Sequence, residues 1–491
     1  MSERLKTLAC AVLVGILACI HFVADRGRPN LPFWDENYYV TAAQRYLDGT
    51  AQFAAHPPLG LMLIAAGEAL MQENQGLNLS MAAAQKHVRG EQLPFGFSLQ
   101  GLRLGPSLFA AGGALLFFGL MFSLTGERIT ALAFSCLYLH ENAFMVHLPA
   151  VHLDAFQLFF VLGALWCLVA AIRQDRPPRR RLALLFGLCV GWASMVKANA
   201  VLLLAGGLWL LWRERCSTAN SSRQRAARAT AHIVLCMVLG FGLSVASVMT
   251  VHTALSRHMP DAGTEAGRQD LPFISERYRD YLQDGKVLTP LLVADVSSSY
   301  LRFMTADLRG VPKGSRSDSI PLLWPVHDGA LNYRWDSNGQ ETRYVQLVGN
   351  LVNWGTGLGA LLVCGAWVLS RRLLRAPGRV PSADQATVEM LLLIYVFYMA
   401  AHVWLGTQRI MYLYHYFIPL LLTYLMVPLC WRMLADARQW TPRFRHSAVL
   451  TYVCATLATC AFFWPLTRHE PLSREACEAR NIIVQVVQCQ P

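Results

Sequence analysis

The segment Trp34–Tyr39 reads Trp-Asp-Glu-Asn-Tyr-Tyr, and the segment His56–Gly60 reads His-Pro-Pro-Leu-Gly. The adjacent acids Asp35 and Glu36 lie just beyond the first hydrophobic stretch, where charges are costly and often functional. One interpretation is local: Asp35 caps a helix over Glu36–Leu47, and the proline pair begins the next helix. The other interpretation places the two carboxylates in a polar reaction centre at the membrane surface. The remainder of the chain favours the second.

The composition is that of a membrane protein. Of 491 residues, 54% are hydrophobic and 15% are charged, whereas a soluble domain carries about 25% charged residues. Several apolar runs approach or exceed the roughly 20 residues that a helix needs to cross a bilayer. We therefore predict an all-α polytopic membrane protein.

The net charge of +12 does not indicate a nucleic-acid-binding protein, because the basic residues gather in short connectors between apolar runs. Arginine-rich connectors in alternate loops are the positive-inside signature of cytoplasmic loops. We expect membrane lipids, and no nucleic acid, among the partners. The basic segments are Arg173–Arg181, Arg213–Arg228, Arg371–Arg379 and Arg432–Arg445, together with the head that contains Arg4 and Lys6.

We predict about eleven transmembrane spans, with the N-terminus in the cytoplasm and the C-terminus outside. Leu8–Ala24 is expected to be a retained signal anchor. Leu182–Trp212 is long for one crossing and is basic at both ends, so we predict two short helices that meet near Lys197 on the outer side. The other spans are predicted at Leu99–Leu124, Ile129–Val146, Ala150–Ile172, Ala231–Leu255, Leu347–Leu369, Glu389–Leu405, Ile410–Leu429 and Val449–Trp464.

These spans divide the chain into four regions. Residues 1–255 form an N-terminal transmembrane module that includes a first outer loop over residues 25–97. Residues 256–346 form a second outer loop, residues 347–465 the C-terminal helices, and residues 466–491 an outer tail. Within the first loop, Leu59–Met71 is apolar but too short to span, so we expect it to lie in the membrane interface.

With this topology, the ionisable residues that interrupt apolar sequence gather on the outer side. Cations at headgroup depth can hold a phosphate or diphosphate, and a carboxylate beside them can act as general base for an incoming hydroxyl. We therefore expect a lipid-linked phosphate as substrate. The residues are Asp35, Glu36, His56, Glu141, His147, His152, Asp154, Lys197 and Arg409.

Several residues on this side have a simpler explanation when they are taken alone. Lys197 and Arg409 can snorkel from helix ends to the interface, and Asp154 can cap the start of a helix. His415, between two tyrosines, is on its own more typical of a hydrogen-bonded interfacial histidine than of a ligand. Their occurrence together on one side favours the functional interpretation.

The same segments resemble the motifs of the protein O-mannosyltransferase (dolichyl-phosphate-mannose–protein mannosyltransferase) family of GT-C glycosyltransferases, along nearly the whole chain. Each motif alone is weak evidence, but their shared order along the chain is specific. The predicted number of eleven spans is also the number expected for this family. The motifs are Asp35-Glu36, His56–Gly60, Glu141-Asn142 through Leu153-Asp154, Val196-Lys197, Trp324-Pro325, Gly349-Asn350 with Trp354, and Arg409 with Tyr414-His415-Tyr416.

The resemblance implies a GT-C fold, a polyprenyl-phosphate sugar as donor, and inversion at the anomeric carbon. It implies Asp35 as the base that deprotonates the acceptor hydroxyl, and Lys197 and Arg409 as residues that face the donor phosphate. No set of metal ligands is evident, although an acidic pair can recruit a divalent cation. The other residues implied in the substrate site are Glu36, His56, Glu141, Asp154, Tyr414 and His415.

The sequence departs from the family pattern in three ways, which bear on the substrate and on the kind of organism that the protein comes from. Leu61 stands where the family usually has lysine, and Pro149 stands where it usually has arginine. His147 or His152 is expected to replace the contact of the missing arginine with the sugar. The second outer loop is too short for the β-trefoil MIR domain of the eukaryotic enzymes. The resemblance is therefore to a bacterial form in the inner membrane, with the active site and the C-terminus in the periplasm.

If the tail is periplasmic, two of its cysteines are expected to form a disulfide. Cys477 and Cys489 would share an oxidising compartment, where a disulfide that closes a short loop is expected. The alternative is that each is buried as a free thiol.

Three hypotheses about function follow. The first is transfer of a hexose, mannose above all, from a polyprenyl phosphate to Ser/Thr of exported proteins. The second keeps the fold and donor class but has a lipid or glycan acceptor, as in the related aminoarabinose transferases that modify lipid A. The third, a non-enzymatic transporter of lipid-linked sugars, is disfavoured because transporters show broken helices near the midplane and internal repeats. The sequence indicates neither the carrier length nor the oligomeric state.

Overall fold

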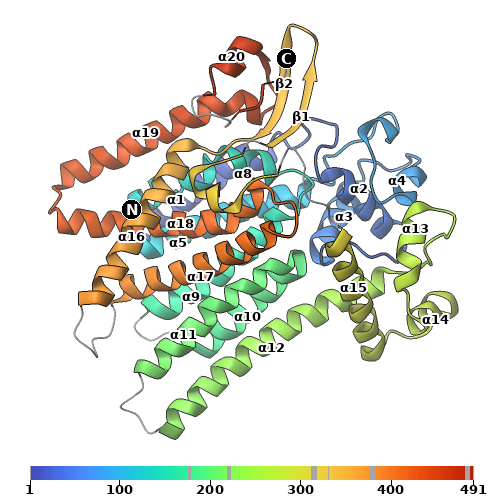
Figure 1. Ribbon diagram of the computed structural model, residues 1–491, viewed down its shortest axis with the longest axis horizontal. Helices are drawn as coiled ribbons and strands as arrows, with labels where there is room; N and C mark the ends of the chain where they lie inside the picture. Colours follow the sequence, from blue (N-terminus) through green and yellow to red (C-terminus); the bar gives the residue numbers. More distant parts are fainter. Residues whose placement is uncertain are drawn as a thin grey trace.

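Long apolar helices form the larger part of the molecule (Figure 1). The computed structural model describes residues 2–174, 179–217, 223–310, 318–329, 331–374, 382–481 and 487–489. Within these residues, eight helical segments are long and apolar enough to cross a membrane, which agrees with the predicted helical polytopic fold. They belong to α1 (Glu3–Ala18) with η1 (Cys19–Val23), α5 (Leu104–Thr125), α9 (Asp154–Arg173), α12 (Arg223–Leu255), α16 (Leu351–Leu374), α17 (Ala383–Gly406), η6 (Leu413–Tyr416) with α18 (Phe417–Ala437), and α19 (Pro442–Thr467).

Two predicted membrane segments are made of shorter pieces. In place of one helix over Ile129–Val146 there are three consecutive helices, and the chain is extended at Glu141 before the third. The predicted pair within Leu182–Trp212 does meet at Lys197, where the backbone is extended. Because these pieces are not among the eight, the number of eleven spans stays a prediction. The pieces are α6 (Arg128–Phe134), α7 (Cys136–Leu139), α8 (Asn142–His147), α10 (Arg179–Val196), η3 (Ala198–Leu203) and α11 (Leu204–Ser217).

The predicted cytoplasmic connectors are only partly visible. Three of the four basic segments include residues outside the described part of the chain, namely 175–178, 218–222 and 375–379. In the described part, Arg173 and Arg432 both pair with Asp384 at the start of α17. These pairs join the ends of α9, α17 and α18 on the side of the molecule opposite Lys197.

Helices α10 and α12 pack backbone to backbone, side by side in Figure 1. Small residues make this possible, because a methyl group on Gly187 would overlap the Met237 carbonyl oxygen and one on Gly240 would overlap the Leu184 carbonyl oxygen. Close approach through small residues is a common way for transmembrane helices to associate. This contact fixes the position of Lys197, which follows the last residue of α10.

The two outer loops fold together into one polar layer at the right of Figure 1. Lys86 of the first loop and Asp270 of the second form an ion pair of 2.6 Å, and a shared apolar cluster lies between the loops. Helix α3 keeps the predicted bounds and packs against α2, α5 and α10. The elements of this layer are α2 (Glu36–Leu47), α3 (Leu59–Met71), α4 (Ser80–Ala84), η2 (Gly90–Gln92), α13 (Glu265–Asp270), η4 (Leu271–Phe273), α14 (Glu276–Asp284) and α15 (Pro290–Gly310).

A small antiparallel sheet, absent from the all-α prediction, links the second outer loop to the tail. Its strand order is β1-β2-β3, and the register of the β1–β2 pair shifts between Asn332 and Arg334. A disulfide joins Cys477 and Cys489, the pair expected from the sequence. The elements are η5 (Pro321–Val326), β1 (Leu331–Ser337), β2 (Glu341–Leu347), β3 (Pro471–Ser473) and α20 (Arg474–Glu478).

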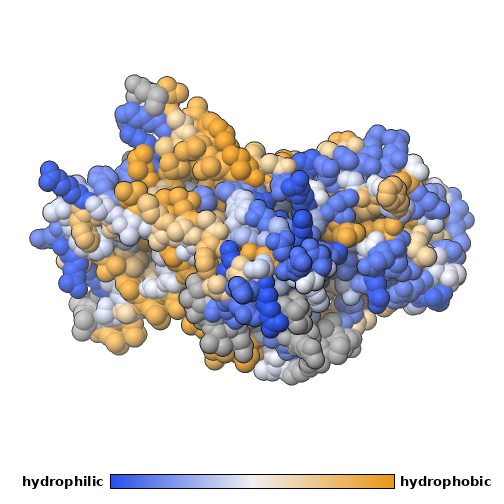
Figure 2. Space-filling model, turned by 90° about the horizontal axis from the view of Figure 1, so that it is seen from above, coloured by the Kyte–Doolittle hydropathy of each residue, from blue (hydrophilic) through white to orange (hydrophobic). Residues whose placement is uncertain are grey.

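The surface divides in the way expected of a membrane protein with a large extramembrane layer. Figure 2 shows hydrophobic surface gathered over the bundle and hydrophilic surface over the layer of short helices at the right. Large exposed apolar side chains on the long helices include Leu115, Leu235 and Leu362. The residues described next lie where the bundle meets the polar layer.

Candidate active site

Asp35 directs its side chain into the molecule and not along its own helix. It is the residue before α2, but its carboxylate makes no capping hydrogen bond to that helix. Tyr414, at the start of the last-but-one long helix, donates its hydroxyl to Asp35 Oδ2 at 3.3 Å. The interpretation of Asp35 as a helix cap is therefore wrong. The preceding residue, Trp34, has a left-handed backbone with φ of 52°.

Asp154 and Lys197 form a buried ion pair beside this carboxylate. Lys197 Nζ lies 2.8 and 2.7 Å from the two carboxylate oxygens of Asp154, at the junction of α10 with the first turn of α9. His147 Nε2 lies 2.8 Å from the same carboxylate. The ring of Tyr414 lies 5.4 Å from the Lys197 ammonium and stacks on His147 at 4.9 Å. The structure thus brings together residues from four of the predicted motifs.

The electrostatics of this group favour a base at Asp35. Burial raises the pKa of the Asp35 carboxyl, while the charge of the neighbouring Lys197 acts to lower it. A carboxylate whose pKa is raised binds a proton more strongly, and this makes it a better general base near neutral pH. The Lys197 ammonium pairs with the Asp154 carboxylate. Asp35 is therefore not its main partner.

Arg409 supplies a cation that is not neutralised within the described residues. It lies in the turn between α17 and η6. Its guanidinium Nε is buried, and no hydrogen-bond or ion-pair partner for the guanidinium is found in the described part of the chain. An arginine of this kind presents a planar set of donors to a phosphate.

His56 lies within the field of the same cations. Burial and the charges of Lys197 and Arg409 together lower the pKa of His56 to about 3, while Asp154 acts in the opposite direction. The imidazole is therefore neutral at physiological pH and can accept or donate one hydrogen bond. Its backbone carbonyl accepts the hydroxyl of Tyr300, which anchors this segment to α15.

Glu36 is held by contacts within the protein. Its carboxylate is fully buried and accepts two hydrogen bonds from Arg103, at 2.8 and 2.7 Å. The backbone N–H groups of Phe33 and Val151 also donate to it. With four donors already in place, Glu36 joins α2 to the start of α5 and to the turn before α9.

Glu141 is likewise held by contacts within the protein. It caps α8 and accepts hydrogen bonds from Asn350 N at 2.8 Å, Trp354 Nε1 at 3.2 Å and Tyr424 Oη at 2.7 Å. It therefore fastens α8 to α16 and α18.

His415 lies behind Tyr414. Its Nδ1 accepts the backbone N–H of Tyr412 at 3.1 Å, and its ring stacks on Tyr414 and on Trp324 at 4.6 and 6.3 Å. It shapes the turn that presents Tyr414 to Asp35. The Trp-Pro motif of the second outer loop contributes to the site through this stack.

Sequence reasoning missed two aromatic residues of the site. Tyr333, in β1, bonds to His147 Nδ1 at 2.6 Å and lies 5.4 Å from the ring of Trp34. Tyr412 lies 5.1 Å from the same indole. The only signal for Tyr412 was its closeness to the Tyr-His-Tyr motif, and Tyr333 carried none because its strand was not predicted.

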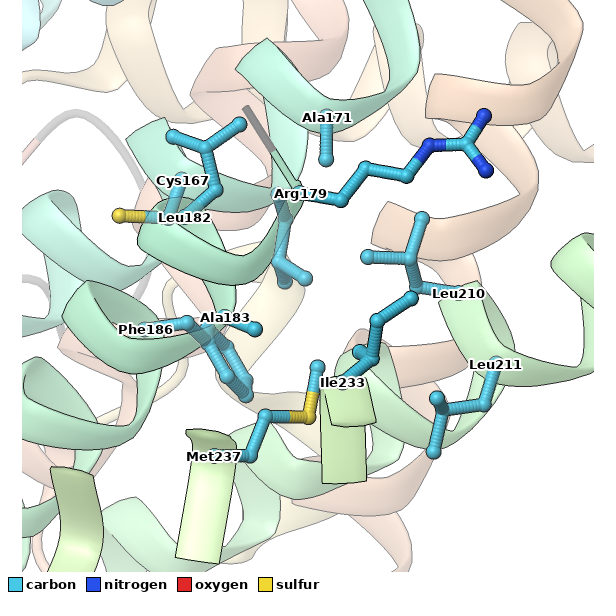
Figure 3. Close-up of a pocket in the computed structure, with 11 residues that line it drawn as sticks. Cys167, Ala171, Arg179, Leu182, Ala183, Phe186, Leu210, Leu211, Ile233 and Met237 are labelled. Carbon is cyan, nitrogen blue, oxygen red and sulfur yellow. The ribbon is translucent and has the colours of Figure 1, made fainter. Parts of the chain in front are cut away.

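No group of three or more His, Cys, Asp or Glu side chains suited to a metal ion is found among the described residues. The divalent cation considered from the sequence therefore has no ligand set of that size in this part of the chain. A separate apolar cavity of about 20 Å³ lies between α9, α10, α11 and α12 (Figure 3). It is lined by the first turns of α10, at the end of that helix away from Lys197.

Comparison with known proteins decides the family. The family model for dolichyl-phosphate-mannose–protein mannosyltransferases matches residues 12–254, and the model for the C-terminal four-helix region of protein O-mannosyltransferases matches residues 301–485. The chain belongs to the protein O-mannosyltransferase family. The motifs of that family seen in the sequence lie within the two matched regions.

A curated relative and a solved structure agree with this family membership. Dolichyl-phosphate-mannose–protein mannosyltransferase 3 of Saccharomyces cerevisiae is 24% identical over 207 residues, which are 41% of this chain and 26% of that protein. The chain thus matches about a quarter of the length of this curated relative. The S. cerevisiae protein O-mannosyltransferase Pmt1–Pmt2 complex bound to the sugar donor has a TM-score of 0.80 at 13% identity, over 99% of this chain and 93% of that one. The GT-C fold expected from the resemblance is confirmed.

The structure of an archaeal oligosaccharyltransferase from Archaeoglobus fulgidus is less similar to this chain. Its TM-score is 0.48 at 11% identity, with 100% of this chain and 60% of that one covered.

Proposed function

We propose that this protein transfers mannose from a polyprenyl phosphate to the hydroxyl of Ser or Thr in exported proteins. The observation that carries the proposal is the position of Asp35, which makes no side-chain cap to its helix and lies beside the Asp154–Lys197 pair. The name of the curated relative, a dolichyl-phosphate-mannose–protein mannosyltransferase, supports both the sugar and the class of acceptor.

In the proposed reaction, Asp35 accepts the proton of the acceptor hydroxyl as its oxygen attacks the anomeric carbon. The bond between that carbon and the carrier phosphate breaks, so the configuration is inverted. A phosphate is a good leaving group and needs charge stabilisation more than a proton. Arg409 and Lys197 supply this stabilisation, and Asp154 shapes the acceptor and sugar side of the site.

The proposed orientation places this site on the periplasmic face of a bacterial inner membrane. The basic connectors support this orientation. In the predicted topology they lie on one side of the membrane, which the positive-inside rule makes cytoplasmic, and the site residues lie on the other side. The disulfide between Cys477 and Cys489 supports an oxidising compartment for the tail. The N-terminus is then cytoplasmic.

The proposal is tested with Asp35→Asn, which keeps the shape of the side chain and removes the base. Removal of a general base lowers the rate about 100-fold or more. Purified protein is supplied with a synthetic polyprenyl-phosphate mannose and a Ser/Thr peptide, and the product is measured by mass spectrometry. The matched control is Asp25→Asn, an exposed carboxylate on the same loop that pairs with Arg28 at 3.6 Å. Transfer that survives in Asp35→Asn rules out the assignment of the base.

A second measurement identifies the acceptor in cells. Periplasmic proteins and extracted lipid A are compared by mass spectrometry in cells with and without the gene. Loss of hexose from Ser/Thr peptides is the expected result. Loss of a sugar from a lipid or glycan, with the peptides unchanged, would contradict the protein acceptor.

A further inference from the structure

Tyr333 occupies an irregular position in the sheet. Its neighbours Asn332 and Arg334 lie opposite two consecutive residues of β2, so Tyr333 is the extra residue of a β-bulge. A bulge turns one side chain away from the regular alternation of a strand and is frequent next to active sites. Here the side chain of Tyr333 is 7% exposed and reaches His147 Nδ1 at 2.6 Å.

His147 stands between Tyr333 and the ion pair of the site. Its other ring nitrogen, Nε2, lies 2.8 Å from Asp154 Oδ2. The Asp154 carboxylate, paired with Lys197, can only accept hydrogen bonds, so Nε2 carries a hydrogen. In a neutral imidazole, the partner of one nitrogen decides which nitrogen is protonated. Tyr333 is the partner of the other nitrogen.

We propose that Tyr333 is a positioning residue for the transfer reaction. Its hydroxyl donates to His147 Nδ1 and so keeps the hydrogen of the imidazole on Nε2, where it holds Asp154 in place against Lys197. The inference rests on the proposed function of the same site. It assigns the hairpin of the second outer loop a direct part in the geometry of the reaction.

Packing of the aromatic ring does not require the hydroxyl. The ring of Tyr333 stacks on Phe33 at 5.7 Å and tilts against Trp34 at 5.4 Å. Phenylalanine would keep both contacts and would remove only the group that faces His147. Without that donor, the neutral imidazole can place its hydrogen on Nδ1, and Asp154 then loses one of its hydrogen bonds.

The test is a double-mutant cycle with Tyr333→Phe and His147→Gln. A glutamine amide can donate to Asp154 and has no tautomer for Tyr333 to set. We expect Tyr333→Phe alone to lower kcat about tenfold, because a buried hydrogen bond is lost, with little change in the KM for the acceptor peptide. In the His147→Gln protein, the same change should lower kcat no further.

The chain offers a matched control in a second buried Tyr–His pair. Tyr46 Oη lies 2.8 Å from His252 Nδ1, and the two side chains are 7% and 0% exposed. This pair joins α2 to α12 within the outer layer and does not contact Asp154. Tyr46→Phe should lower thermal stability about as much as Tyr333→Phe and leave kcat unchanged.

Three outcomes overturn the inference. They are an unchanged kcat in Tyr333→Phe, an equal loss in the presence and absence of His147→Gln, and a similar loss of kcat in Tyr46→Phe. Failure of the proposed function is distinguished by Asp35→Asn. If wild type and Asp35→Asn transfer mannose equally, the function itself is wrong, whereas an additive cycle in an enzyme that depends on Asp35 rejects only the role of Tyr333.

Discussion

At the scale of single residues, Trp34 holds an unfavourable backbone conformation directly before Asp35. Its φ of 52° lies in the left-handed region, which costs an L-residue about 1–2 kcal/mol. Such conformations persist where the surrounding structure enforces them, and they gather at active sites. Here the conformation turns the indole toward Tyr333 and Tyr412.

The backbone strain at Trp34 is measured by two substitutions that both remove the indole. Glycine adopts a positive φ without penalty, so Trp34→Gly should be about 1 kcal/mol more stable than Trp34→Ala. This reverses the usual order of the two residues. Thermal unfolding in detergent gives the difference, and mannose transfer should fall equally in both variants. A more stable alanine variant would contradict the strain.

The pH dependence of transfer reports on Asp35. The base acts only when it is ionised, so kcat/KM should fall as the pH is lowered through its pKa. Since burial raises that pKa, the acid limb should lie at a higher pH than that of an exposed carboxyl, whose pKa is 3.8. Initial rates measured across the acid range test this, and a rate that is flat down to pH 4 would contradict it.

Acidic residues show how far sequence reasoning about the site could reach. Asp35, Glu36 and Glu141 all lie in motifs that resemble those of the family and on the same predicted side of the membrane. What separates them is their partners, because Arg103 neutralises Glu36 and Asn350 binds Glu141. Those partners come from 67 and 209 residues further along the chain. The spacing of residues in a sequence carries no record of such contacts.

At the scale of elements, the contact between α10 and α12 depends on individual glycines. A Cβ atom on Gly240 would overlap backbone atoms of α10, while one on Gly242, in the same helix, would meet nothing within 4 Å. Gly240→Ala should therefore destabilise the protein by about 1–3 kcal/mol, and Gly242→Ala should not. Thermal unfolding of the two variants in the same detergent measures the difference. Equal stabilities would show that the contact is not as close as described.

The predictability of each element follows from the strength of its local signals. Helices α2 and α3 begin and end as predicted, because turn and proline residues flank clear apolar patterns. The β1–β2 hairpin was missed although Asn338-Gly339, a typical hairpin turn, separates its strands. Polar and charged side chains interrupt the alternation of each strand. The chain breaks in α6–α8 were missed because the segment is long enough for one span, although Ser135 and His140-Glu141-Asn142 interrupt its apolar sequence.

At the scale of the whole molecule, the disulfide ties the end of the chain to the sheet. Cys477 is fully buried, and Gln488 bonds to Gln346 of β2. Closure of a short loop by a disulfide is worth about 2–4 kcal/mol. Cys489→Ser should lower the unfolding temperature, and reductant should do the same to the wild type.

The control for the disulfide is Cys454→Ser, which removes an exposed free thiol from α19. It should leave the unfolding temperature unchanged. Thiol labelling of the unfolded wild type should reveal two further reactive cysteines only after reduction. An unchanged thiol count would contradict the bond.

The site is assembled from both halves of the chain. Asp35 and the Asp154–Lys197 pair come from the region that matches the first family model, and Arg409 and Tyr414 come from the region that matches the second. The hydroxyl of Tyr414, 3.3 Å from Asp35, joins the two. A displacement of about 1 Å between reacting groups can cost about 100-fold in rate. A compound lodged between the two halves would therefore inhibit the enzyme although it resembled neither sugar, lipid nor peptide.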